Sequence, residues 1–152
     1  MNKIIFSLLA FSVCFTIACK SGGKKPKEDK EKPKTGVDSL LIIIDKGHMD
    51  GMGKIGRLHN TRKAVQAAVD SLGKLSSTPK KYIDQLNAAI QDIDYADFAM
   101  DKWMTEYNED SAINNEAARI LYLQGETQKI ESMTAAIRNS IQKADSLLKV
   151  KF

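Results

Sequence analysis

The chain has 152 residues, enough for one domain, and its 23 basic and 19 acidic side chains give a formal net charge of +4. The positive excess lies in residues 20–36, which carry seven lysines and three acidic side chains. Residues 37–152 carry 15 basic and 16 acidic side chains, so this larger part has no bulk charge with which to bind nucleic acid.

Residues 1–18 have the pattern of an export signal. Lys3 supplies a positive start, and the apolar run that follows from Ile4 to Ile17 is short for a permanent transmembrane helix. The run ends in Ala18-Cys19, and a small residue before cysteine is what lipoprotein signal peptidase requires. We therefore expect Cys19 to become the lipidated first residue. The alternative is an ordinary secretory signal in which this cysteine stands by chance.

The two cysteines leave the mature domain without a free thiol. Cys14 is removed with the signal, and Cys19 is acylated, which excludes disulfides, zinc thiolates and thiol catalysis. Residues 20–36 contain no large apolar side chain and are expected to form a disordered tether, either held at anionic lipid headgroups or acting as a solvated spacer. The expected location is the cell envelope, lipid-anchored at the outer membrane and facing the periplasm.

Residues 37–152 show helical periodicity and no strand-like alternation. Apolar side chains recur on one face of three segments, which predicts helices over about 37–75, 79–108 and 116–149. Thr78-Pro79 separates the first two segments, with Thr78 the expected cap of the second. Ser111 or Asn115 is the expected cap of the third. Short turns make neighbouring helices antiparallel. We therefore predict an all-α, up-down-up antiparallel three-helix bundle with long, coiled-coil-like helices. A fourth helix supplied by dimerisation is the alternative.

The two most distinctive stretches are expected to meet in one layer of this bundle. Residues 96–107 contain the only tryptophan, and residues 48–59 contain both histidines. Pairing the first two helices about their turn places Met52 beside Trp103, and the second turn, near residue 112, brings Ile120 of the third helix to the same level. The candidate residues of this layer are His48, Met52, His59, Asp97, Met100, Trp103 and Met104.

This layer has a structural and a functional interpretation. As core, Met and Trp fill space, His59 bonds to Asp97, and His48 bonds to Tyr107 or to a backbone carbonyl. As a site, His48 and Met52 are the candidate ligands of a soft metal or haem. The structural interpretation is preferred, with no metal and no cofactor. No arrangement of nucleophile, base and acid indicates an enzyme.

Motifs in both stretches are similar to those of a known family. A histidine is followed four and eight positions later by Met and Gly, and the pattern Ala-Asp-x-Ala-Met-x-x-Trp-Met follows in the second helix. A Tyr-Leu pair stands in the third. The matching residues are His48, Met52, Gly56, Ala96, Asp97, Ala99, Met100, Trp103, Met104, Tyr122 and Leu123. The chain departs from the pattern at Met49, where Asp is usual, and at Gly53, where Pro is usual.

On these residues the chain resembles small lipoproteins of Bacteroidota-type bacteria that carry the label "viral A-type inclusion protein". The resemblance implies anchoring and a helical fold, and it brings no established activity. The expected function is that of a non-enzymatic, lipid-anchored scaffold or binding module. Its partners are the membrane, through the N-terminal lipid, and an unknown envelope protein. The alternatives are a small metal- or haem-binding envelope protein and a periplasmic chaperone or adaptor.

Overall fold

The computed structural model describes residues 35–75, 77 and 79–150 and contains three helices, α1 (Gly36–Leu72), α2 (Lys80–Glu106) and α3 (Glu116–Leu148). Their bounds differ by no more than three residues from those predicted. The expected signal, Cys19 and most of the expected tether lie outside the described residues, as does Thr78, the expected cap of α2.

Two of the helices begin with side-chain caps. The Thr35 side chain accepts a hydrogen bond from the backbone N–H of Asp38, whose carboxylate accepts one from the Thr35 N–H, which completes a capping box. Asn115 accepts from the backbone N–H of Ala118 and begins α3, as predicted. The capping box places the helix start at Gly36, within the stretch expected to be tether.

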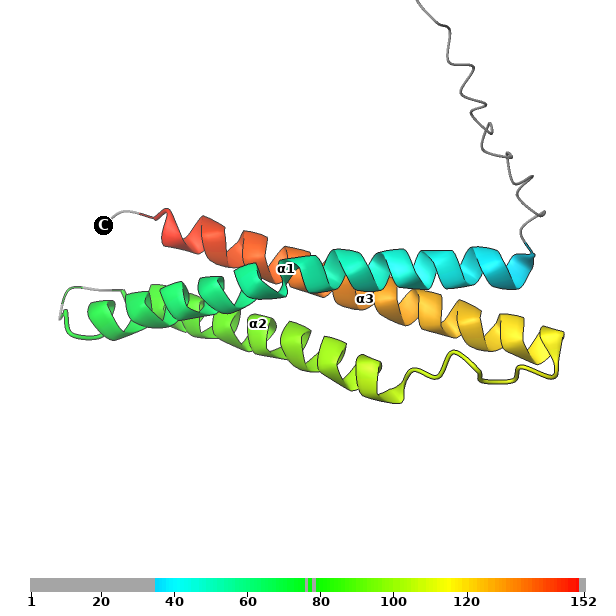
Figure 1. The fold of residues 1–152 in the computed structure, drawn as a ribbon. Helices are drawn as coiled ribbons and strands as arrows, with labels where there is room; N and C mark the ends of the chain where they lie inside the picture. Colours follow the sequence, from blue (N-terminus) through cyan, green and yellow to red (C-terminus); the bar gives the residue numbers. More distant parts are fainter. Residues whose placement is uncertain (1–34, 76, 78, 151–152) are drawn as a thin grey trace, which may run out of the picture. The chain divides into compact units, whose positions relative to one another are not determined.

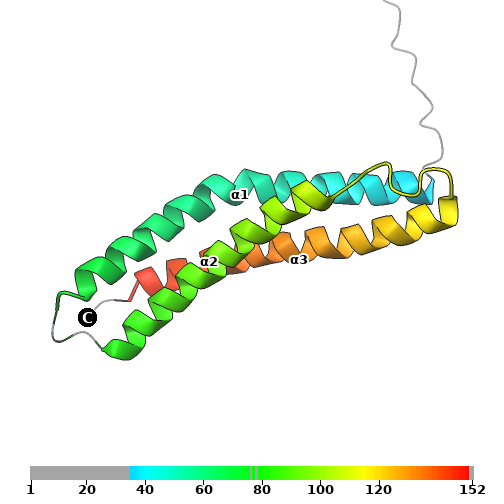
Figure 2. The ribbon, with the colours of Figure 1, turned by 90° about the horizontal axis from the view of Figure 1, so that it is seen from below.

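The helices form the predicted up-down-up bundle. α1 and α3 run in the same direction and share the most extensive contact, and α2 runs antiparallel to both (Figure 1). α1 remains helical through its four interior glycines, Gly47, Gly51, Gly53 and Gly56, and bends along its length (Figure 2). None of the helices in the described part of the chain combines the length and apolar composition needed to cross a membrane.

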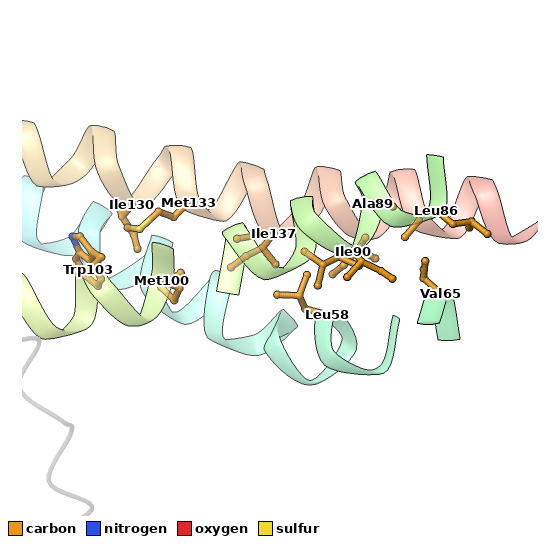
Figure 3. Close-up of a cluster of buried hydrophobic side chains, with 14 of the residues drawn as sticks. Leu58, Val65, Leu86, Ala89, Ile90, Met100, Trp103, Ile130, Met133 and Ile137 are labelled. Carbon is orange, nitrogen blue, oxygen red and sulfur yellow. The ribbon is translucent and has the colours of Figure 1, made fainter. Parts of the chain in front are cut away.

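The core follows the bundle from end to end. Figure 3 shows it running from Trp103 past Met100 and Ile137 to Leu86 and Val65. All three helices contribute apolar side chains that are completely buried; these include Leu58, Val65, Leu86, Ile93, Met100, Leu123, Ile130 and Ile137. Burial of this kind of surface is the main term that favours folding, at about 25 cal/mol per Å² removed from water.

An ion pair crosses each of the three helix interfaces at the surface. The pairs are Arg62–Asp94 between α1 and α2, Arg57–Asp145 between α1 and α3, and Lys143–Asp92 between α2 and α3. Exposed pairs of this kind contribute only ~0–1 kcal/mol each. The apolar core therefore stabilises the bundle, and the surface charges add little to it.

Candidate functional site

Trp103 lies at the centre of the layer that the sequence singled out. The side chain is 6% exposed, and its indole N–H donates to a carboxylate oxygen of Glu126 at 2.8 Å. Glu126 is itself 4% exposed, and its other oxygen accepts from Lys129 at 2.8 Å. This hydrogen bond raises the pKa of Lys129 above its ordinary value. The indole is thus held in one orientation by a buried carboxylate on α3.

Glu126 was not predicted as a member of this layer. It stands between Leu123 and Ile130, three and four positions away, and therefore on the apolar face of α3. A buried indole N–H requires an acceptor, so an acidic residue on that face was the available signal. Sequence reasoning placed Ile120 opposite Trp103 instead. The nine residues from Tyr107 to Asn115 lie outside the helices and carry the chain past the end of α2, which shifts α3.

Aromatic rings continue from Trp103 toward α1 and α3. The ring of His48 lies 5.6 Å from the indole in a tilted arrangement, and Tyr107 stacks on the indole at 4.8 Å. Tyr122 follows, with its ring 6.4 Å from that of Tyr107. Tyr122 also accepts a hydrogen bond from the backbone N–H of Asn108 at 2.9 Å, which ties the loop after α2 to α3.

His48 corrects one prediction. Its Nε2 atom is enclosed and has no hydrogen-bond partner among the described residues, so the expected bond from this nitrogen to Tyr107 or to a backbone carbonyl is absent. A polar atom left unpaired in this way costs free energy unless a partner is supplied from elsewhere. The ring of His48 instead lies beside Trp103, where Met52 was expected.

Gly51 and Met100 explain why His48, and not Met52, lies against Trp103. Gly51 is buried, and a Cβ placed there would overlap the terminal methyl of Met100, so α1 presents Gly51 to α2 at this level. Met52, one position further, is turned outward and is 38% exposed. Met104 is also exposed to the same extent. The predicted layer therefore keeps Met100 and Trp103 as core, while Met52 and Met104 lie at the surface.

His59 and Asp97 form the pair that the sequence predicted. His59 Nε2 lies 2.9 Å and 3.0 Å from the two carboxylate oxygens of Asp97. Both side chains are partly open to solvent, and the pair lies 11 residues along α1 from His48. At 1.5 Å per residue this separation is about 16 Å, so the two histidines belong to separate environments.

A pocket of about 550 Å³ opens where α1 passes the end of α2; we call it the α1–α2 pocket. Aliphatic side chains of α1 and aromatic side chains near the end of α2 form most of its wall. The lining residues are Leu41, Ile42, Ile44, Asp45, His48, Trp103, Met104, Tyr107 and Glu109. A concave, mainly apolar pocket with a few polar groups is the usual form of a small-ligand site.

The chemistry available in the α1–α2 pocket favours binding. Its titratable side chains are Asp45, His48, Tyr107 and Glu109, and burial raises the pKa of Tyr107, with the nearby charge of Glu109 the next contribution. Within residues 35–75, 77 and 79–150, no three His, Cys, Asp or Glu side chains come together in a way that could hold a metal ion. Met52, the proposed second ligand beside His48, is not among the lining residues.

A second hollow lies on the other side of Trp103, between α2 and α3. Its volume is about 650 Å³, and the exposed Tyr95 and Phe98 stand on its wall. Trp103 is the only one of the predicted candidates that lines it.

Searches of protein-family models, curated proteins and solved structures found nothing that matches this chain.

Proposed function

We propose that this protein is a non-enzymatic, lipid-anchored binding module of the cell envelope, and that the α1–α2 pocket is its binding site. The observation that carries the proposal is a pocket of about 550 Å³ whose wall includes a tryptophan fixed by a buried carboxylate. A fixed aromatic side chain loses little conformational entropy when a ligand packs on it. The anchoring part of the proposal rests on the Ala18-Cys19 sequence.

Trp103 makes the binding proposal directly measurable because it is the only tryptophan in the chain. We expect a small neutral aromatic probe, 2-phenylethanol, to change the tryptophan fluorescence of the purified full chain in a saturable way. The matched variants are Ile42→Ser and Ile43→Ser, neighbours that are 48% and 43% exposed. Only Ile42 lines the α1–α2 pocket. Ile42→Ser should lower the affinity of the probe several-fold, since each buried methylene contributes ~0.8 kcal/mol to the binding free energy.

Ile43→Ser is expected to leave the affinity of the probe unchanged, because Ile43 is not one of the residues that line the pocket. The binding proposal is wrong if the fluorescence response does not saturate. It is equally wrong if the two serine variants lower the affinity of the probe to the same degree, since that would indicate a general change in α1.

Membrane fractionation tests the anchor separately. Replacing Cys19 with Ala should release the protein from the membrane fraction, because a lipoprotein N-terminus supplies the acyl chains that stable attachment requires. Cys14→Ala is the matched control, since this cysteine lies in the part expected to be removed. If the Cys19→Ala protein stays in the membrane fraction through a detergent-free wash, the anchor is not at Cys19.

A further inference from the structure

We infer that the α1–α2 pocket selects an organic cation with an apolar body, such as an arylalkyl or alkyl amine. This inference rests on the proposed function, that the α1–α2 pocket binds a ligand, and adds the chemical class of that ligand. Charge, helix polarity and aromatic surface each support it independently.

Charge is the first of these observations. Asp45 and Glu109 line the α1–α2 pocket from opposite elements, α1 and the loop after α2. Both are exposed, and neither carboxylate forms a hydrogen bond or ion pair with another described residue. No lysine or arginine is found among the described residues that line the pocket. The wall therefore carries two unpaired negative charges and no positive one.

The end of α2 adds to this negative character. α2 ends at Glu106, and its last turn carries no basic side chain. Trp103 and Met104 belong to that turn and line the pocket. Carbonyl groups at a helix C-terminus carry a partial negative charge equivalent to roughly half an elementary charge, which stabilises a nearby cation. Helices often supply that cation from a lysine of the last turn, and α2 has none there; Lys102, one residue before this turn, pairs with Glu106 instead.

The aromatic side chains provide a surface that suits a cation with an apolar body. Trp103 and Tyr107 stack with their rings 4.8 Å apart, and both line the pocket. Indole and phenol faces attract ammonium and guanidinium groups by ~0.5–2 kcal/mol.

Arg119 is the cation that acts against this preference. Its charge lowers the pKa of Tyr107, yet burial and the charge of Glu109 both contribute more, and they raise that pKa. Arg119 does not line the α1–α2 pocket. At Tyr107 the charge of Glu109 therefore outweighs that of Arg119.

Three probes of nearly the same shape test the inference on the purified full chain. They are 2-phenylethylamine, which is cationic, 2-phenylethanol, which is neutral, and 3-phenylpropionate, which is anionic; the readout is Trp103 fluorescence. We expect the amine to bind most tightly and the anion least. Asp45→Asn and Glu109→Gln should each weaken binding of the amine about two- to fivefold, the range for one exposed charge pair. Neither substitution should change the affinity of the alcohol.

Asp84→Asn is the matched charge control, because Asp84 is exposed on α2 and lies 19 residues before Trp103. It should leave the affinity of the amine unchanged. A blocked peptide with one lysine between apolar residues presents the same ammonium group on a polypeptide. Tighter binding of the peptide than of the amine indicates a protein as the source of the cation, and weaker binding indicates a free amine.

The outcomes separate the two proposals. If amine, alcohol and anion bind equally, the pocket binds ligands but has no preference for cations, and this inference is overturned alone. If the anion binds best, the same conclusion follows. If none of the three binds, the proposed function falls together with the inference.

Discussion

The glycines of α1 offer the sharpest test of how this bundle packs, because the same substitution has opposite expected effects at different positions. At Gly53 and Gly56, an added Cβ meets no other atom within 4 Å. Alanine there should stabilise the protein by ~0.5–1 kcal/mol, the helix preference of Ala over Gly. At Gly47, an added Cβ lies 3.0 Å and 3.1 Å from two carbons of Ile130, which is completely buried.

Ile130 is branched at Cβ and stiff, so it cannot move away from an added methyl without moving α3. Overpacking of this kind costs ~1–3 kcal/mol, which outweighs the helix gain and leaves Gly47→Ala destabilised by up to ~2 kcal/mol. Gly51→Ala should fall between the two groups, since it displaces only the flexible end of Met100.

Urea unfolding of the four alanine variants, followed by circular dichroism, gives the free energies of unfolding directly. The expected order of stability is Gly53→Ala and Gly56→Ala above the parent protein, with Gly47→Ala below it. A difference of 1 kcal/mol corresponds to about 4 °C in melting temperature for a domain of this size. Stabilisation by Gly47→Ala equal to that of Gly53→Ala would refute the close packing of α1 against Ile130.

Two further predictions concern the indole and the first helix. Trp103→Ala should cost ~3–5 kcal/mol of stability. Trp103→Phe should cost about 1–3 kcal/mol, because the buried Glu126 loses a hydrogen-bond donor. Equal melting temperatures for Trp103→Phe and the parent protein would contradict this hydrogen bond. Hydrogen bonds from Thr35 lower the pKa of Asp38 below its ordinary 3.8. The ionised carboxylate therefore stabilises the fold at pH values above 3.8, and this contribution is lost as the pH falls through the lowered pKa. Asp38→Asn should therefore flatten the acid limb of a plot of stability against pH, and an unchanged acid limb would argue against the capping box.

The charges that the sequence displays have a smaller role than their number suggests. Asp92, Asp94 and Asp97 all form pairs across helix interfaces, with Lys143, Arg62 and His59 respectively. Each pair is partly or largely exposed, and such pairs contribute little to stability. The unpaired Asp45 and Glu109 are less conspicuous in the sequence, yet they give the α1–α2 pocket its charge.

The apolar pattern of the sequence determined the fold class, the three helices and the faces they bury. Period and caps are local properties, so Asn115 could be recognised as a cap and Ile93 as core without knowledge of their neighbours. The pairing of His59 with Asp97 also followed, because these residues lie closer to the first turn than Met52 and Trp103 do, so an error in register had less chain over which to accumulate.

Only the tertiary structure decided which side chains meet at the far end of the bundle. Each residue of uncertainty at a turn moves a helix by 1.5 Å and rotates its face by about 100°, so small errors accumulate along long helices. Gly51 admits Met100 and turns Met52 outward, and the loop before α3 brings Glu126 rather than Ile120 to Trp103. The α1–α2 pocket is likewise a tertiary feature, since it forms where α2 ends and α1 continues.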